Sequence, residues 1–156
     1  MDLKVNVSGR IAKPVEVVFE AVVNPEHLSH FFTTGGAQGR LESGKTVMWD
    51  FADFPGAFPV RVETVVPNEK IVLYWGAQDD APEGEKFVPH DTRVTMTFEP
   101  LDGNTRTLVR IMEEGWQPTP KGLKAAFGNN EGWTGMFWTM KAWLEHGLEM
   151  RTGTYK

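Results

Sequence analysis

The sequence predicts an α+β fold in which a curved antiparallel β-sheet wraps around a long C-terminal α-helix. From residue 37 to residue 113, short runs of β-branched, aromatic and aliphatic residues alternate with turn residues, which is typical of a strand meander. From residue 132 onward the apolar period changes from two to about 3.6 residues, which indicates a helix. A sheet of about six or seven strands cannot bury its apolar face alone, so this helix must supply the second layer of the core.

The N-terminal segment predicts one strand followed by two short helices. Residues 3–11 carry apolar side chains at alternate positions, which suits a strand with one buried face. A helix is predicted over residues 14–23, because Pro14 is a favourable first residue and the apolar residues after it recur at three- and four-residue spacing. Pro25 opens a second short helix that runs through Phe32.

The central strands are predicted from their composition and from the turns between them. Residues 67–70 and 101–104 are expected to be hairpin connections, and the second contains an Asp-Gly pair that accepts positive φ. Residues 79–89, rich in acids and proline, are expected to form a flexible surface loop, and whether it acts as a lid stays open. The predicted strands cover residues 37–41, 46–52, 57–66, 70–76, 91–99 and 105–113.

The C-terminal helix is predicted over residues 132–150, after a turn-rich segment at 115–120. At 1.5 Å per residue it would be roughly 28 Å long, enough to cross the whole sheet. No interior linker or repeat interrupts the chain, so one domain is expected over residues 1–156. The predicted core stripe of the helix consists of Trp133, Phe137, Met140, Leu144 and Leu148.

Composition and charge exclude several classes of function. The formal net charge is −5 and no stretch concentrates lysine and arginine, which argues against nucleic acid and anionic membranes as partners. There is no cysteine, so disulfides, thiolate nucleophiles and thiolate metal sites are excluded. No apolar run is long enough to insert into a membrane and no signal peptide is recognisable, so a cytoplasmic location is expected.

Two segments resemble a known family. Residues 8–21 (SGRIAKPVEVVFEA), followed by Asn24-Pro25-Glu26, resemble the opening of proteins related to the activator of the heat-shock protein 90 ATPase, within the START-like (SRPBCC) superfamily. Residues 130–133 (NEGW) and 136–147 (MFWTMKAWLEHG) are similar to the ending of that family. The resemblance spans nearly the whole chain, and it implies the helix-grip fold: a curved sheet around a long C-terminal helix, with a ligand-sized cavity between them.

The resemblance also has departures that bear on function. Many relatives place a tryptophan after the first short helices, where this chain has His30-Phe31-Phe32, which suggests a pocket with a different lining. Eukaryotic co-chaperone activators carry a separate N-terminal domain that engages the chaperone, and with a strand starting at Leu3 no such domain is expected here. The family name alone is therefore not taken as the function.

Aromatic residues are the strongest signal for a ligand site. Six tryptophans and ten phenylalanines are available, and large rings line apolar pockets as well as filling cores. Most of these rings are expected to be core, and indole N–H groups could offer polar contacts inside a cavity. The residues predicted to line the cavity are His30, Phe31, Trp49, Asp50, Phe51, Trp75, Phe98, Trp116, Trp133, Phe137 and Trp138.

Evidence for catalysis or cofactor binding is sparse in the sequence. His30 and His90 are the histidines best placed to face a cavity, and Asp50 and Asp53 lie near a strand end, but a surface location is the more common fate of such residues. No metal-ligand spacing, phosphate-binding loop or nucleophile motif is present. No catalytic residue, metal or cofactor is therefore assigned, and whether the chain is an enzyme stays open, with a non-enzyme favoured.

Three functions remain as alternatives. The first is binding of a small apolar or amphipathic ligand between helix and sheet, oriented by polar groups such as His30, Asp50, Arg61 or Arg110. The second, implied by the resemblance, is a chaperone-activating role in the stress response, which an exposed apolar patch would favour. The third, a cavity enzyme of the cyclase or hydrolase type, would need a buried acid or base in the pocket.

Overall fold

The computed structural model describes residues 2–79, 84–86 and 88–156, and within them seven strands form one antiparallel sheet. Strands β2 to β7 are neighbours in chain order, and β1 pairs with β7, so the sheet order is β1-β7-β6-β5-β4-β3-β2. This confirms the predicted meander and fold class. The strands are β1 (Lys4–Ile11), β2 (Gly36–Gln38), β3 (Thr46–Phe51), β4 (Phe54–Val66), β5 (Lys70–Gly76), β6 (Asp91–Leu101) and β7 (Arg106–Glu114).

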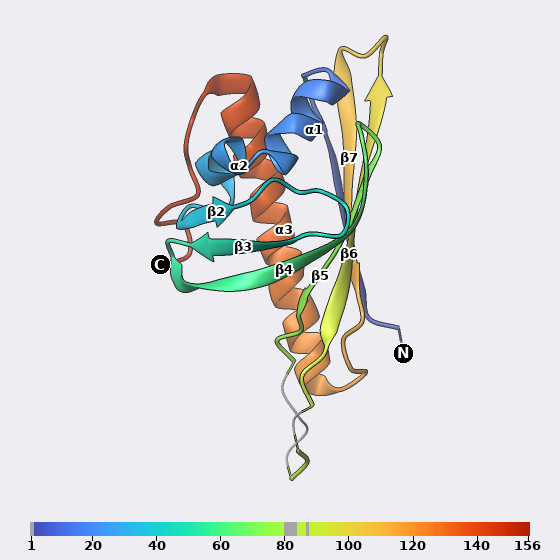
Figure 1. The fold of residues 1–156 in the computed structure, drawn as a ribbon, viewed down its shortest axis with the longest axis vertical. Helices are drawn as coiled ribbons and strands as arrows, with labels where there is room; N and C mark the ends of the chain where they lie inside the picture. The colour runs from blue at the N-terminus through green and yellow to red at the C-terminus, as the bar shows by residue number, and fades with distance from the viewer. Residues whose placement is uncertain (1, 80–83, 87) are drawn as a thin grey trace.

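Three helices complete the fold: α1 (Val15–Val23), α2 (Pro25–Phe31) and α3 (Pro120–His146). Figure 1 shows α3 lying along one face of the sheet, with α1 and α2 beside its C-terminal half. From the end of α3 the chain turns back, and its last residues lie beside the β3–β4 hairpin (Figure 1). None of the helices among the described residues is long and apolar enough to cross a membrane.

The turn between β6 and β7 also holds the start of α1. Asn104 has a left-handed backbone with φ of 62°, which asparagine tolerates. Its Oδ1 accepts a 2.9 Å hydrogen bond from the Val15 backbone N–H, and its Nδ2 donates to Glu16 at 2.9 Å. Pro14, at the N-cap of α1, provides no side-chain cap, so the distant hairpin satisfies a helix N–H that would otherwise lack a partner.

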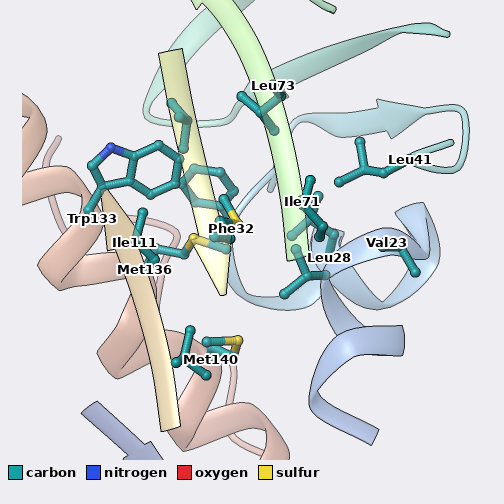
Figure 2. Packing of buried hydrophobic residues seen from close by; sticks show 14 of the residues in the cluster. Val23, Leu28, Phe32, Leu41, Ile71, Leu73, Ile111, Trp133, Met136 and Met140 are labelled. Carbon is teal, nitrogen blue, oxygen red and sulfur yellow. The ribbon is translucent and has the colours of Figure 1, made fainter. Parts of the chain in front are cut away.

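The core lies between α3, the two short helices and the concave face of the sheet. Figure 2 shows Trp133, Met136 and Met140 extending from α3 toward Phe32 and the strand residues. The alternation predicted for β6 is confirmed, because the side chains at 94, 96 and 98 are buried against the helix layer. Register shifts in the β3–β4 and β4–β5 pairs bend this end of the sheet.

The predicted boundaries of the long helix were wrong at both ends. Helix α3 begins at Pro120, about three turns before the predicted start at residue 132. Thr119 caps it by accepting a 3.1 Å hydrogen bond from the Gly122 N–H. It ends at His146, because Gly147 adopts the left-handed conformation, with φ of 66°, that closes helices. Leu148, predicted to be core, therefore lies beyond the helix and is exposed.

The segment at 79–89 differs from its prediction at one described position. Residues 80–83 and 87 lie outside the described residues, so the expectation of a flexible loop or lid is not addressed for them. Asp79, at the start of the segment, was expected on the surface but is only 1% exposed. Its carboxylate is held under the chain that leads into α3, where the Gln117 backbone N–H donates to it at 2.9 Å.

Candidate functional site

A cavity of about 1160 Å³ lies between the first turns of α3 and strands β3 to β6. The apolar part of the lining comes from Phe51, Phe54, Phe58, Pro59, Trp75 and Ala125, and the polar part from Thr46, Arg61, Tyr74, Gln78, Asp79, Asp91, Lys121, Lys124 and Asn129. The volume lies slightly above the usual range of about 300–1,000 Å³ for small-molecule sites.

The inner wall of this cavity is built on two stacked indoles. Trp75 lines the cavity, and its ring stacks on that of Trp133, with centroids 5.1 Å apart. Trp133 is buried behind it in α3. Both indole N–H groups donate to the carboxylate of Glu113, each at 2.7 Å. The two rings are thereby fixed relative to each other by one acceptor.

Glu113 is a fully buried carboxylate with a complete set of hydrogen bonds. Beyond the two indoles, it accepts from Thr92 Oγ1 at 2.5 Å and from Asn129 Nδ2 at 2.9 and 3.1 Å. No cation pairs with it among the described residues. Hydrogen-bond donors to both oxygens replace the water molecules that the carboxylate loses on burial. Because of this replacement, the free-energy cost of removing the charge from water is small.

Sequence reasoning missed Glu113, although a signal was present. The alternation of β7 places Val109, Ile111 and Glu113 on one face, so the same pattern that predicts the apolar core also places this glutamate in it. A charged residue at an inward position of a strand indicates that hydrogen-bond donors surround it in the folded protein.

A second polar group at the cavity consists of Asp79 and His90. Asp79 lines the cavity, and its Oδ2 lies 3.2 Å from His90 Nε2 in addition to accepting from the Gln117 N–H. The side chain of His90 is 28% exposed, and Val88 O lies 3.3 Å from its Nδ1. His90 was singled out from the sequence as facing a cavity, and the structure places it directly behind a lining residue.

The C-terminal residues 147–156 contact aromatic residues at the β3–β4 end of the cavity. The guanidinium of Arg151 is buried over the rings of Phe32, Phe51 and Tyr155, at 5.2, 5.8 and 4.8 Å from their centroids. Burial lowers the pKa of Arg151 below its ordinary value. These C-terminal residues, here called the tail, are hydrogen-bonded to Asp53 in the β3–β4 turn.

Asp53 accepts from two backbone N–H groups of the tail, those of Gly153 at 2.7 Å and Tyr155 at 2.9 Å. These hydrogen bonds, that from Tyr155 first, hold the pKa of Asp53 below its ordinary value. Asp53 was expected to be simply solvated, and nothing local in the sequence marks it as a contact of residues a hundred positions away.

The predicted lining residues separate into three groups. Phe51 and Trp75 line the cavity, and Trp133 lies immediately behind Trp75. Three others are buried in the core, namely Phe31, Trp49 and Phe98. The remainder are placed elsewhere.

Two of the remaining residues lie outside the cavity lining. The ring of His30 stacks on Trp143 with centroids 4.0 Å apart, and its Nδ1 contacts the carboxylate of Glu149. Trp138 is 62% exposed on the outer side of α3. The position of Trp138 follows from the helical period, which turns this side chain away from the inner face of α3.

Three more predicted residues have structural contacts away from the cavity lining. Asp50 Oδ1 accepts from the Gly56 N–H at 3.0 Å and so shapes the β3–β4 turn. Phe137 packs against Gly9 of β1. Trp116 is buried beside the segment that holds Asp79, and its indole N–H has no hydrogen-bond partner among the described residues. Within those same residues, no group of histidine and acidic side chains could hold a metal ion.

Solved structures with the same fold include SSP2350 from Staphylococcus saprophyticus, which is 27% identical with a TM-score of 0.76 over 95% of this chain and 96% of that one. DynU16, a protein of the dynemicin biosynthetic locus, is 21% identical with a TM-score of 0.76, over 97% of this chain and 50% of that one. The Aha1 dimer from Colwellia psychrerythraea is 19% identical with a TM-score of 0.71, over 92% of this chain and 97% of that one. No curated protein matched the chain.

These likenesses agree with the resemblance of residues 8–21 and 136–147 and with the observed element order. The family model described as Activator of Hsp90 ATPase homolog 1-like protein matches residues 12–145, which is most of the chain. The chain therefore belongs to the family of Activator of Hsp90 ATPase homolog 1-like proteins.

Proposed function

We propose that the protein binds a small apolar or amphipathic ligand in the cavity between α3 and strands β3 to β6. The observation that supports this is the 1160 Å³ volume bounded by Phe51, Phe58 and Trp75 on one side and by the first turns of α3 on the other. A cavity of this size with aromatic walls gains affinity from buried apolar area, at about 25 cal/mol per Å². The family and the fold support the proposal at the level of architecture.

The rigidity of the cavity wall adds to this support. Trp75 cannot rotate freely, because its indole N–H is bonded to Glu113 and its ring is stacked on Trp133. A wall that is already ordered loses little conformational entropy when a ligand binds, which favours affinity. The polar residues Arg61, Lys124 and Asp91 around the apolar wall suit a ligand with at least one polar group.

Binding can be tested with N-phenyl-1-naphthylamine, an apolar probe whose fluorescence rises in apolar surroundings, and with its displacement by fatty acids, isoprenoids and aromatic polyketides. The matched variants are Gly128→Leu and Glu131→Leu. Gly128 lines the cavity, and a Cβ there meets no atom within 4 Å, so leucine can extend into the space without a clash. Glu131 is an exposed residue of the same helix and is not part of the lining.

We expect Gly128→Leu to weaken probe binding by about tenfold or more, as a bulky side chain takes up ligand volume, and Glu131→Leu to bind like the wild type. A displacing ligand at a hundredfold excess over its Kd should also raise the stability of the wild type by about 2.7 kcal/mol. Equal probe binding by both variants would place the bound probe elsewhere and contradict the proposal.

A chaperone-directed role is a second candidate, supported by two exposed aromatic residues on α3. Phe127 is 68% exposed and Trp138 lies about three turns further along nearly the same side of the helix. Exposed rings of this kind are typical of contact surfaces. Titration of Hsp90 with the wild type and with the double variant Phe127→Ala, Trp138→Ala tests it, and absence of binding by the wild type would refute it.

A further inference from the structure

Asp79 has a carboxylate oxygen that nothing in the described part of the chain satisfies. The residue lines the cavity and is 1% exposed. Its Oδ2 accepts from the Gln117 N–H at 2.9 Å and lies 3.2 Å from His90 Nε2. Its Oδ1 has no hydrogen-bond partner among the described residues. Buried polar atoms in native proteins are nearly always paired, so an unpaired carboxylate oxygen beside a ligand-sized cavity indicates an acceptor that a ligand can use.

The position of this carboxylate is fixed by the chain that enters α3. The N–H that holds Asp79 belongs to Gln117, whose carbonyl packs so closely on Gly122 that a Cβ at residue 122 would overlap it. Thr119 caps the same turn. Oδ2 is therefore anchored to a rigid helix start, and Oδ1 is presented in a defined direction rather than as a mobile surface acid.

We propose that Asp79 is the polar anchor of the cavity and that its Oδ1 accepts a hydrogen bond from a neutral hydroxyl on an otherwise apolar ligand. This inference rests on the proposed function and specifies its ligand class. The Nε2 of His90 lies 3.2 Å from the other oxygen of the same carboxylate but makes no hydrogen bond within the described residues.

The charges around the cavity select this donor. A carboxylate or phosphate on the ligand would meet the negative charge of Asp79 at the point of contact. An ammonium group would have to enter a cavity that Arg61, Lys121 and Lys124 also line. A hydroxyl avoids both repulsions and donates to a charged acceptor, which makes a stronger hydrogen bond than a neutral pair.

The test compares two probes of nearly equal shape, 2-naphthol and 2-methylnaphthalene, by quenching of tryptophan fluorescence. We expect the wild type to bind 2-naphthol about tenfold or more tightly than 2-methylnaphthalene. In Asp79→Ala this preference should disappear, while the affinity for 2-methylnaphthalene stays within about twofold of the wild type. The control is Glu99→Ala, which removes an exposed carboxylate that is not part of the cavity lining. This control should keep the preference.

A second readout uses the unmodified protein, in case Asp79→Ala folds poorly. The amide resonance of Gln117 reports on Asp79, because its N–H donates to Oδ2. We expect this resonance to shift on addition of 2-naphthol and to stay in place on addition of 2-methylnaphthalene at equal occupancy.

The outcomes separate this inference from the proposed function. If neither probe binds, the proposed function fails and the anchor fails with it. If both bind equally, or if the preference for 2-naphthol survives Asp79→Ala, the cavity stands but Asp79 is not its anchor. A preference for 2-naphthoate over 2-naphthol that is independent of residue 79 also overturns the inference and assigns the polar contact to the lysines.

Discussion

Trp75 and Trp133 lie stacked with their centroids 5.1 Å apart, and both donate their indole N–H to one carboxylate. One tryptophan comes from the sheet and the other from α3, so this pair joins the two layers of the fold at the wall of the cavity. Removing the shared acceptor therefore affects stability and the shape of the site together.

The first prediction concerns that acceptor. Glu113→Gln keeps the size of the side chain but turns one acceptor into an NH2 group that faces indole, hydroxyl or amide donors. We expect the free energy of unfolding to fall by about 2–3 kcal/mol, measured by urea denaturation. The control, Glu114→Gln, changes a half-exposed neighbour that pairs with Lys4 at 3.4 Å, and should lower the free energy of unfolding by less than about 1 kcal/mol. Equal losses in both variants would show that the indole pair does not depend on the carboxylate.

The second prediction concerns the contact between β1 and α3. A Cβ at Gly9 would overlap the ring of Phe137, which is buried against this strand. We expect Gly9→Ala to destabilise the protein by about 1–3 kcal/mol, because the well-packed ring has to move. Adding Phe137→Leu should recover part of this loss, so the double variant is more stable than the sum of the single changes implies. If the stability changes of the two single variants, measured by thermal unfolding, simply add in the double variant, the contact is contradicted.

The third prediction compares two glycines inside α3. A Cβ at Gly122 would overlap the backbone carbonyl of Gln117, which cannot move without disturbing the helix start, whereas a Cβ at Gly132 meets no atom within 4 Å. Gly122→Ala should destabilise the protein by more than about 2 kcal/mol, and Gly132→Ala should stabilise it by about 0.5–1 kcal/mol. Urea denaturation of the two variants measures both effects, and a neutral Gly122→Ala would be incompatible with this packing.

The fourth prediction is a pH dependence of the C-terminal tail. Because hydrogen bonds from the tail hold the pKa of Asp53 below its ordinary value, its contribution to docking is fully present above its pKa in the unfolded chain. The contribution is lost as the pH falls through the lowered pKa of the folded state. Amide hydrogen exchange at Gly153 and Tyr155 should therefore report undocking only in acid, after correction for the intrinsic exchange rate.

Variants of Asp53 provide the comparison. Asp53→Ala should leave both amides exposed to exchange at neutral pH, and Glu99→Ala, a change of an exposed acid elsewhere, should leave them protected. Protection of Tyr155 that persists in Asp53→Ala would mean that Arg151 and its ring contacts hold the tail without the carboxylate.

Periodic patterns in the sequence were enough to predict the sheet, but not the ends of α3. The alternation at 94, 96 and 98 predicted the buried face of β6, and that face is buried as expected. The first three turns of α3 include Gly122 and Gly128, which have low helix propensity, so only packing and the cap at Thr119 make them helical. Thr119 and Pro120 were the available signals.

The candidate site was predicted only in part, for a physical reason that differs by residue. Phe51 and Trp75 were found because large rings on strands tend to face the helix layer. Asp79 was missed because its burial depends on the Gln117 N–H, which lies far along the chain. The residues next to Asp79 in the sequence do not indicate this contact. Arg151 was missed because the tail returns to the β3–β4 turn only after the helix has ended at Gly147.

The pairing of β1 with β7 has a consequence for how the chain folds. Lys4 pairs with Glu114 and Ile11 with Thr107, so the first strand of this sheet to be synthesised has no partner until nearly the whole sheet has followed it. The hairpins from β3 to β7 can form locally as they emerge, but closure of this edge and its packing on α3 are late, non-local steps. Until then, the exposed edges of β1 and β7 are the places where a nascent chain is most open to pairing with another copy of itself.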